Sequence, residues 1–147
     1  MNKRYRPAIF AVVYKRSGNK TLYLLLKRKL HWTGWEFPKG GIEKGEKEIG
    51  AVKREIKEET SLKILKITNY RIKGRYTYNR VCKRDRPGFV GQTYSLYSAE
   101  VGEGKIKFDK IEHSAFKWVE FDKALRMLKW PSQRKCLRIV EKSLKHF

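Results

Sequence analysis

Cysteine is scarce in this sequence, and long hydrophobic runs are missing from it. The two cysteines, Cys82 and Cys136, are too few for a disulfide framework and are expected to be reduced thiols. No apolar run approaches the roughly 20 residues of a membrane-spanning helix, and the opening segment MNKRYRPAIF contains no apolar signal core. We therefore expect neither a disulfide-rich secreted protein nor a membrane protein, but a cytoplasmic one.

Acidic residues are also few, with 15 Asp and Glu against 36 Lys and Arg, which gives a net charge of +21. Residues 1–30 carry nine basic side chains and no acid, and residues 71–90 carry seven against the single Asp85. Residues 31–70 are nearly balanced, at eight against seven. Such an excess attracts polyanions, whether polyphosphate or nucleic acid. General solubility, or the lysine enrichment of thermophiles, is the alternative explanation.

The 147 residues are enough for one domain, 1–147, with its own core. A helix is expected from about Gly45 to Thr60, with Ile49, Val52 and Ile56 as its buried stripe and its carboxylates beside that stripe. The other expected elements are strands at 7–14, 21–27, 62–73, 75–81 (pairing with 92–101) and 116–121, and helices at 122–128 and 132–144. This order fits an α/β sandwich with a mixed sheet, although the pattern alone supports either an α/β or an α+β fold.

The most informative stretch runs from Gly40 to Leu62 and reads GGIEKGEKEIGAVKREIKEETSL. Glu55, Glu58 and Glu59 are three and four residues apart, so a helix places them on one face. Like charges this close are destabilising unless a cation lies among them. Carboxylate oxygens suit Mg²⁺ or Mn²⁺, which also bind phosphate. An ordinary solvated helix with Glu–Lys pairs is the alternative.

The spacing of these residues resembles the Nudix box, the signature of hydrolases that cleave nucleoside diphosphates linked to another moiety. The sequence departs from the box at Ser61, where the family usually has glycine. Glycine there would close the helix in a left-handed conformation, which serine adopts only with strain. The resemblance implies the Nudix fold, an α/β/α sandwich with a mixed sheet, and a divalent metal cofactor, Mg²⁺ or Mn²⁺.

The resemblance also implies roles for residues of the box. Its metal ligands would be three carboxylates and one carbonyl oxygen: Glu55, Glu58, Glu59 and Gly40. Arg54 and Glu46 match the pair that orients the helix and its glutamates. One box glutamate would act as the base for the attacking water, Glu58 and Glu59 being the catalytic candidates, while metal neutralises the polyphosphate.

A second segment, from Ile111 to Val119, is similar to the corresponding segment of the dinucleoside tetraphosphate hydrolase branch. In that branch a glutamate outside the box reaches the metal site as an extra ligand or base. Glu112 is the candidate for this role, and a surface acid is the alternative. His113 is expected to be a structural hydrogen-bonding residue.

Five further residues are candidates for substrate binding. Lys39 follows Pro38, and Pro-Lys-Gly is found in the dinucleoside polyphosphate and RNA-decapping branches, where the lysine would lie beside the phosphate chain. Its alternative is a solvated loop lysine. Tyr76 and Tyr78 share one face of an expected strand, and with Arg75 and Arg80 they could stack a purine and hold its phosphates. Tyrosines on one strand face are, however, more often core residues.

The predicted function is hydrolysis of a phosphoanhydride in a nucleoside polyphosphate, most specifically diadenosine tetraphosphate to ATP and AMP. The first alternative is an RNA 5′-pyrophosphohydrolase, because residues 91–94 resemble those enzymes and the charge of +21 suits RNA. A nucleoside triphosphate substrate and a non-catalytic nucleotide- or RNA-binding module are further alternatives. No membrane partner is predicted, and no oligomeric state follows from the sequence.

Overall fold

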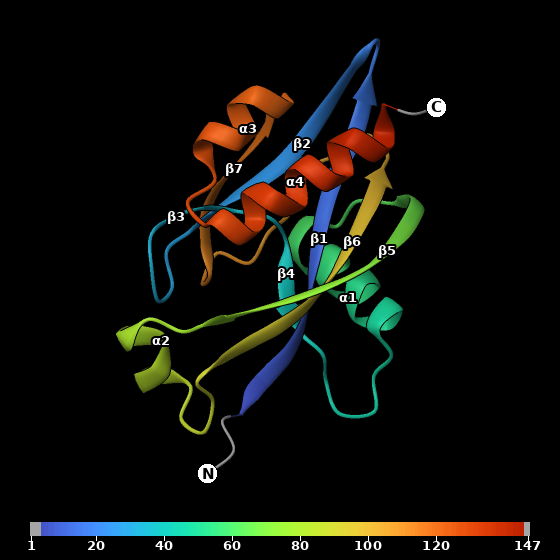
Figure 1. The fold of residues 1–147 in the computed structure, drawn as a ribbon. Coiled ribbons are helices and arrows are strands. Elements are labelled where there is room, and N and C mark those ends of the chain that lie inside the picture. The colour runs from blue at the N-terminus through green and yellow to red at the C-terminus, as the bar shows by residue number, and fades with distance from the viewer. Residues whose placement is uncertain (1–3, 146–147) are drawn as a thin grey trace.

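A computed structural model describes residues 4–145, and Figure 1 shows their arrangement. The elements in chain order are β1 (Tyr5–Ser17), β2 (Lys20–Arg28), β3 (Gly34–Glu36), β4 (Lys39–Gly41), α1 (Glu48–Thr60), β5 (Ile64–Thr77), α2 (Arg80–Asp85), β6 (Gly91–Val101), β7 (His113–Val119), α3 (Phe121–Met127) and α4 (Pro131–Leu144).

The described strands form one seven-stranded sheet in the order β3-β2-β1-β6-β5, with β4 also paired to β1 and β7 to β2. β1 and β6 run parallel, from Tyr5 opposite Gly91 to Tyr14 opposite Glu100. The remaining strand pairs are antiparallel. The predicted mixed sheet is thus confirmed.

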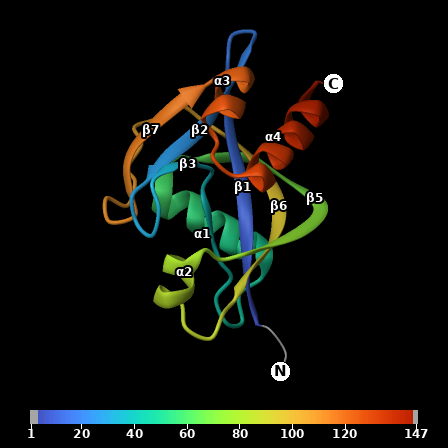
Figure 2. The ribbon, with the colours of Figure 1, turned by 60° about the vertical axis from the view of Figure 1, so that its left-hand side comes forward.

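Helices cover both faces of this sheet, with α1 on one face and α3 and α4 on the other, as Figures 1 and 2 show. Successive side chains of a strand point to opposite faces, so Ile9 packs in the same cluster as Val52 and Ile56 of α1. Its neighbour Phe10 packs in the cluster that contains Leu137 of α4. The predicted α/β/α sandwich is confirmed.

Helix α1 ends at Thr60 as predicted and buries Val52 and Ile56 of the expected stripe, but not Ile49. Ile49, in the first turn, is 45% exposed, and the packed stripe begins only afterwards, at Ala51. Two carboxylates belong to that stripe, because Glu55 is 9% and Glu59 only 3% exposed. The prediction that the carboxylates lie beside the buried face was therefore wrong for these two.

The start of α1 is attached to the sheet by polar contacts. The Glu48 carboxylate accepts hydrogen bonds from the Ser95 and Tyr97 hydroxyls of β6, at 2.8 and 2.9 Å. The helix closes at Ser61, which has the left-handed backbone expected of a glycine, with φ 59°. Both ends of the helix that carries the box carboxylates are therefore fixed.

The segment expected as two strands, 62–73 and 75–81, is one long strand followed by a helix. β5 continues to Thr77 past an irregularity between Asn69 and Lys73, and it pairs with β6 as far as Gly91. Asn79 then accepts a hydrogen bond from the Cys82 amide at 2.8 Å and begins α2. The predicted strand at 75–81 was wrong beyond Thr77, because this cap starts a helix there.

Among residues 4–145 no helix has the length and apolar character needed to cross a bilayer.

Candidate active site

A cavity of about 570 Å³ lies where β1, β4 and β5 meet α2 and the start of α4. Two of the carboxylates that line it are Glu55 and Glu112. Its cationic lining consists of Arg6, Arg28, Lys39 and Arg86. Its aromatic lining consists of Phe10, Trp32, Tyr76, Tyr78 and Trp130. The cavity therefore combines acidic, basic and aromatic groups in one place.

Burial outweighs the positive charge near the buried carboxylates of α1. Burial raises the pKa of Glu55 to about 7. Burial, together with the nearby carboxylates of Glu55, Glu36 and Glu112, raises the pKa of Glu59 well above its usual value. Within residues 4–145, Glu59 Oε2 is buried and has no hydrogen-bond partner. Such a group of buried acids is favourable only when it is protonated or binds a cation.

Glycine is required where the backbone passes this group. A Cβ atom at Gly40 would overlap Glu55 Oε1, so any other residue would displace that carboxylate from the β4 backbone. The structure thus places Gly40 against Glu55, and their roles as metal ligands stay a prediction from the resemblance.

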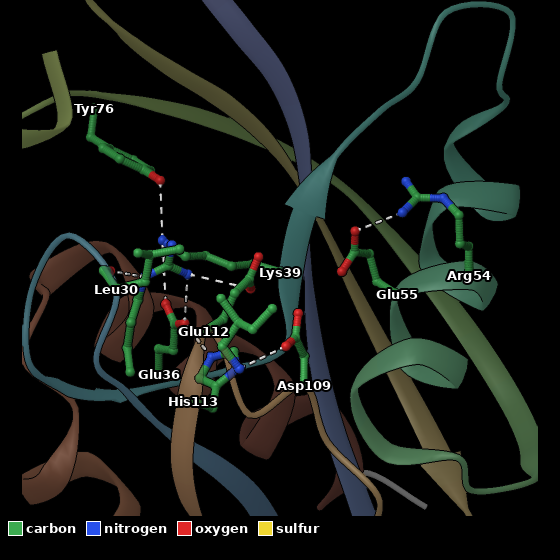
Figure 3. Close-up of polar contacts among 11 residues, drawn as sticks. Leu30, Glu36, Lys39, Arg54, Glu55, Tyr76, Asp109, Glu112 and His113 are labelled. Carbon is green, nitrogen blue, oxygen red and sulfur yellow. Dashed lines mark hydrogen bonds and ion pairs between the residues drawn. The ribbon is translucent and has the colours of Figure 1, made fainter. Parts of the chain in front are cut away.

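Glu112 reaches the same place from the loop before β7. One ligand atom each of Glu59, Glu112 and His113 lies within 4.8 Å of the others. The Glu112 side chain is 35% exposed and faces the cavity (Figure 3). His113 is fully buried, and its Nε2 lies 2.8 Å from Glu36 Oε2. His113 thus has the structural hydrogen bond expected of it.

Arg54 links the loop before α1 to the carboxylate group. Its Nε donates to Glu46 Oε2 at 2.8 Å, and its Nη1 donates to Glu55 Oε1 at 2.8 Å. Its Nη2 donates to the Gly41 carbonyl oxygen at 2.9 Å. The hydrogen bond from Arg54 lowers the pKa of Glu46 to about 2. These contacts join the loop, β4 and α1, and an orienting role for Arg54 and Glu46 stays a prediction from the resemblance.

Glu58 is the most exposed of the three acidic side chains Glu55, Glu58 and Glu59 on α1. Its side chain is 58% exposed, and its Oε2 is 3.5 Å from Arg54 Nη1. It is not among the residues that line the cavity. A catalytic or metal-binding role for Glu58 therefore stays a prediction from the resemblance.

Lys39 and the two tyrosines are together in the cavity. Lys39 Nζ lies 3.3 Å from Glu36 Oε1 and 3.4 Å from the Tyr76 hydroxyl. It is also 5.7 Å from the ring centroids of both Trp32 and Tyr76. The Tyr76 and Tyr78 rings meet edge to face, with centroids 6.2 Å apart. These aromatic rings surround an ammonium group that faces the cavity.

The predicted arginines lie outside the cavity lining, and two others lie within it. The Arg75 guanidinium packs over the Tyr5 ring at 5.1 Å, and Arg80 is exposed at the start of α2. Arg6 and Arg86 line the cavity instead. Sequence analysis missed both, because no local pattern shows that the start of β1 and the end of α2 meet.

Arg6 and Arg86 have no carboxylate partner in the described chain, since none of its ion pairs involves either residue. A Cβ at Gly41 would overlap the Arg6 guanidinium, so this side chain lies against the backbone next to Gly40. Burial, and then the charge of Arg86, lower the pKa of Arg6. Two guanidinium groups without carboxylate partners in one cavity form a favourable place for an anion.

Glu36 was also missed, although the sequence carries a signal for it. It stands between Trp35 and Phe37, and a charged residue inside an aromatic run is typically buried and paired. It is fully buried and is paired with Arg28. Lys39 and His113 lie beside it as well (Figure 3). Burial alone would raise its pKa, but Lys39, His113 and Arg28 outweigh that effect and hold the pKa at about 2.

The carboxylate group fits a divalent metal ion. Glu55, Glu59 and Glu112 offer hard oxygen ligands, the kind that Mg²⁺ and Mn²⁺ bind. The unpartnered Glu59 Oε2 and the raised pKa values are the electrostatic signs of a cation site.

Comparison with known proteins agrees with this geometry. The NUDIX domain family model matches residues 4–139. The chain is 31% identical over 124 residues to an RNA pyrophosphohydrolase of a Nitratiruptor species, covering 81% of this chain and 80% of that protein. It is 26% identical to an RNA pyrophosphohydrolase of Stenotrophomonas maltophilia, where it spans only 60% of that protein's length.

A solved structure is similar over nearly the whole chain. The structure is of an Ap4A hydrolase from C. elegans in a binary complex, with a TM-score of 0.77 and 24% identity, and the match covers 97% of this chain and 99% of that one. At this identity the likeness concerns the fold alone. From the family match and the Nitratiruptor relative, the chain belongs to the Nudix family and is a pyrophosphohydrolase of that family.

Proposed function

We propose that this protein hydrolyses diadenosine tetraphosphate to ATP and AMP, with Mg²⁺ or Mn²⁺ bound by Glu55, Glu59 and Glu112. The observation that supports this most is the composition of one cavity, where a carboxylate group, four cationic side chains and several aromatic rings meet. A volume of about 570 Å³ falls within the usual range for small-molecule sites.

The side chains of the cavity have separate tasks in this reaction. Lys39, Arg6 and Arg86 attract the polyphosphate and hold it with charge-assisted hydrogen bonds. The metal ion, when bound, neutralises phosphate charge and acidifies water. Water oxygen attacks phosphorus, the bond to the bridging oxygen breaks, and a carboxylate takes the proton of the water. Glu112, in the cavity lining, is one candidate for that base, the buried Glu59 close to it is another, and Glu58 is the exposed candidate.

Aromatic rings provide the contacts for a base of the substrate. The Trp32 and Trp130 rings meet edge to face, with centroids 5.3 Å apart, and both line the cavity together with Tyr76 and Tyr78. Purines stack on such rings irrespective of hydrogen bonding. Stacking is thus expected to position the nucleoside, and the cationic side chains are expected to position its phosphates.

RNA with a 5′-triphosphate is the second candidate substrate. It is supported by the names of the curated relatives and by the net charge of +21. Helix α2 adds to this support, because Lys83 and Arg84 are exposed on it while Cys82 of the same helix lines the cavity. An RNA chain leaving the cavity past α2 would meet these cations.

Product analysis separates the two candidates. The protein is incubated with Mg²⁺ and either diadenosine tetraphosphate or a 5′-triphosphorylated RNA, and the products are resolved by chromatography. ATP and AMP in equal amounts, with the RNA unchanged, are the predicted result. Pyrophosphate from the RNA alone would assign the protein to RNA 5′-end processing. Turnover of neither would contradict both candidates.

A further inference from the structure

A buried carboxylate lies beneath the cavity without lining it. Glu36, the last residue of β3, has a side chain that is 1% exposed, and the cavity lining does not include it. Arg28 Nη1 lies 3.1 Å from its Oε2, and His113 Nε2 lies 2.8 Å from the same oxygen. Lys39 Nζ lies 3.3 Å from its Oε1 (Figure 3). Glu36 therefore has a basic group beside each of its oxygens.

Lys39 depends on this carboxylate for its position. A lysine has a long, flexible side chain, and fixing it in one place costs roughly 2 kcal/mol of rotamer entropy. The ion pair with Glu36 restricts the ammonium group to the space beside the Tyr76 hydroxyl and between the Tyr76 and Trp32 rings. From there it faces the cavity, in which the polyphosphate is proposed to bind.

Arg28 connects the same carboxylate to the candidate metal ligands. Its Nε donates to the Leu30 carbonyl oxygen at 2.8 Å, so the guanidinium is fixed on two sides. Its Nη1 lies 3.9 Å from Glu112 Oε2. A displaced Arg28 would thus change the charge beside Glu112, one of the proposed metal ligands.

Glu36 also joins strands that are distant in the sequence. Its partners come from the end of β2, from β4 and from the start of β7. A role in stability alone is the competing explanation, because removing one partner of a buried ion pair leaves an uncompensated charge and destabilises the fold. A purely structural role predicts that a Glu36 variant has a lower Tm, and that its effect on KM is the same whether or not Lys39 is present.

We propose that Glu36 is a positioning residue for phosphoanhydride hydrolysis: it holds the Lys39 ammonium group at the phosphate chain and the Arg28 guanidinium beside Glu112. This inference rests on the proposed function, because it presumes a polyphosphate in the cavity. Glu36 itself touches neither the substrate nor the metal ion.

A double-mutant cycle with Glu36→Gln and Lys39→Met tests the proposal. Each single variant is expected to raise the KM for diadenosine tetraphosphate about tenfold, the loss of one charge-assisted contact. The double variant is expected to stay near that value, since Glu36 acts on KM through Lys39. Independent effects would multiply to about 100-fold and would overturn the proposal. Glu36→Gln is also expected to lower kcat through Arg28, whereas Lys39→Met changes mainly KM.

Binding without metal gives a readout that needs no turnover. Calorimetry in EDTA measures the Kd of tripolyphosphate for the same four proteins, with Glu103→Gln, an exposed carboxylate paired to Lys15, as the matched control. Glu36→Gln is expected to weaken binding in the wild-type background but not in the Lys39→Met background. A lower Tm with unchanged Kd and KM would reduce Glu36 to a structural residue and overturn the proposal.

Two provisions keep the test decisive. If Glu36→Gln does not fold at the assay temperature, Glu36→Asp, which keeps the charge but shortens the side chain, enters the same cycle with the same expectation. If the wild-type protein turns over none of the nucleotides offered, the proposed function fails. The calorimetric cycle then still decides whether Glu36 positions Lys39 for phosphate.

Discussion

At the residue scale, two carboxylates of the box lie where burial opposes their ionised form. Glu55 and Glu59 are buried on the face of α1 that packs against the sheet, a position that apolar residues would stabilise better. The box predicted their identity and spacing. It could not predict their burial, because which face of a helix is covered depends on strands that lie elsewhere in the sequence.

The metal-free protein is predicted to lose stability as pH rises. The pKa of Glu55 is about 7 in the folded state and 4.5 as its ordinary value, so the folded state holds this proton more tightly. Stability is therefore highest below about pH 4.5 for this group, falls as pH rises to about 7 and stays low above it. Glu55→Gln is expected to reduce the fall between pH 5 and pH 8 by roughly 3 kcal/mol.

Urea unfolding in EDTA at the two pH values measures this difference. Saturating Mg²⁺ is expected to remove most of the loss in the wild-type protein, because the cation compensates the ionised carboxylates. Equal pH dependence in the wild-type protein and Glu55→Gln would show that Glu55 is not an uncompensated buried acid.

Ser61 is predicted to be a strained helix end. Its φ of 59° lies in the left-handed region, which costs a non-glycine residue about 1 kcal/mol or more. Ser61→Gly is therefore expected to raise the free energy of unfolding by about 0.5–1 kcal/mol. Urea unfolding measures this difference. Ser61→Ala is the control, because it keeps a Cβ atom and is expected to gain no stability. Equal stability of the two variants would contradict the strain.

At the element scale, the helix and strands of the box region follow from local sequence, whereas α2 does not. The alternation in Arg75–Arg80 favours a strand, and β5 does extend to Thr77. Asn79 then caps α2, and an asparagine side chain bonded to a backbone amide is a weak signal inside an alternating run. The consequence is functional, because α2 brings Arg86 to the cavity and leaves Arg80 exposed.

Arg6 is predicted to bind the phosphate chain in place of Arg75. Arg6→Met is expected to raise the KM for diadenosine tetraphosphate about tenfold, because it removes one of the two guanidinium groups that line the cavity without a carboxylate partner. Arg75→Met removes the same charge from a guanidinium that packs over the Tyr5 ring, outside the cavity lining. It is expected to change KM by less than about twofold. Steady-state kinetics at fixed ionic strength gives both values. A larger increase in KM for Arg75→Met than for Arg6→Met would instead support Arg75 as the phosphate-binding residue, as predicted from the sequence.

At the scale of the whole molecule, the order of elements narrows the fold to α/β or α+β, and the resemblance to the Nudix box adds the sandwich, but neither predicts the strand order. The central parallel pair joins Tyr5–Tyr14 to Gly91–Glu100, and no local pattern connects segments so far apart. That pair brings Arg6 and Gln92 side by side at the cavity. Sequence analysis could therefore find the box carboxylates and Glu112, but not the cations that the sheet brings to them.

The net charge of +21 is a property of the whole surface rather than of the site. Cations inside the cavity face the proposed phosphate chain, whereas those on α2 and β5 are exposed to salt. Exposed charges are screened over about 10 Å at 0.1 M salt. Turnover of a dinucleotide is thus expected to depend on salt less than binding of a long RNA does.

The central claim is that the carboxylate group binds the metal ion on which hydrolysis depends. The most direct measurement compares the wild-type protein, Glu59→Gln and the exposed control Glu103→Gln in turnover of diadenosine tetraphosphate with Mg²⁺. Glu59→Gln is predicted to lose turnover by on the order of 1,000-fold, several kcal/mol of barrier, whereas Glu103→Gln matches the wild-type protein. Wild-type turnover by a folded Glu59→Gln would contradict the claim.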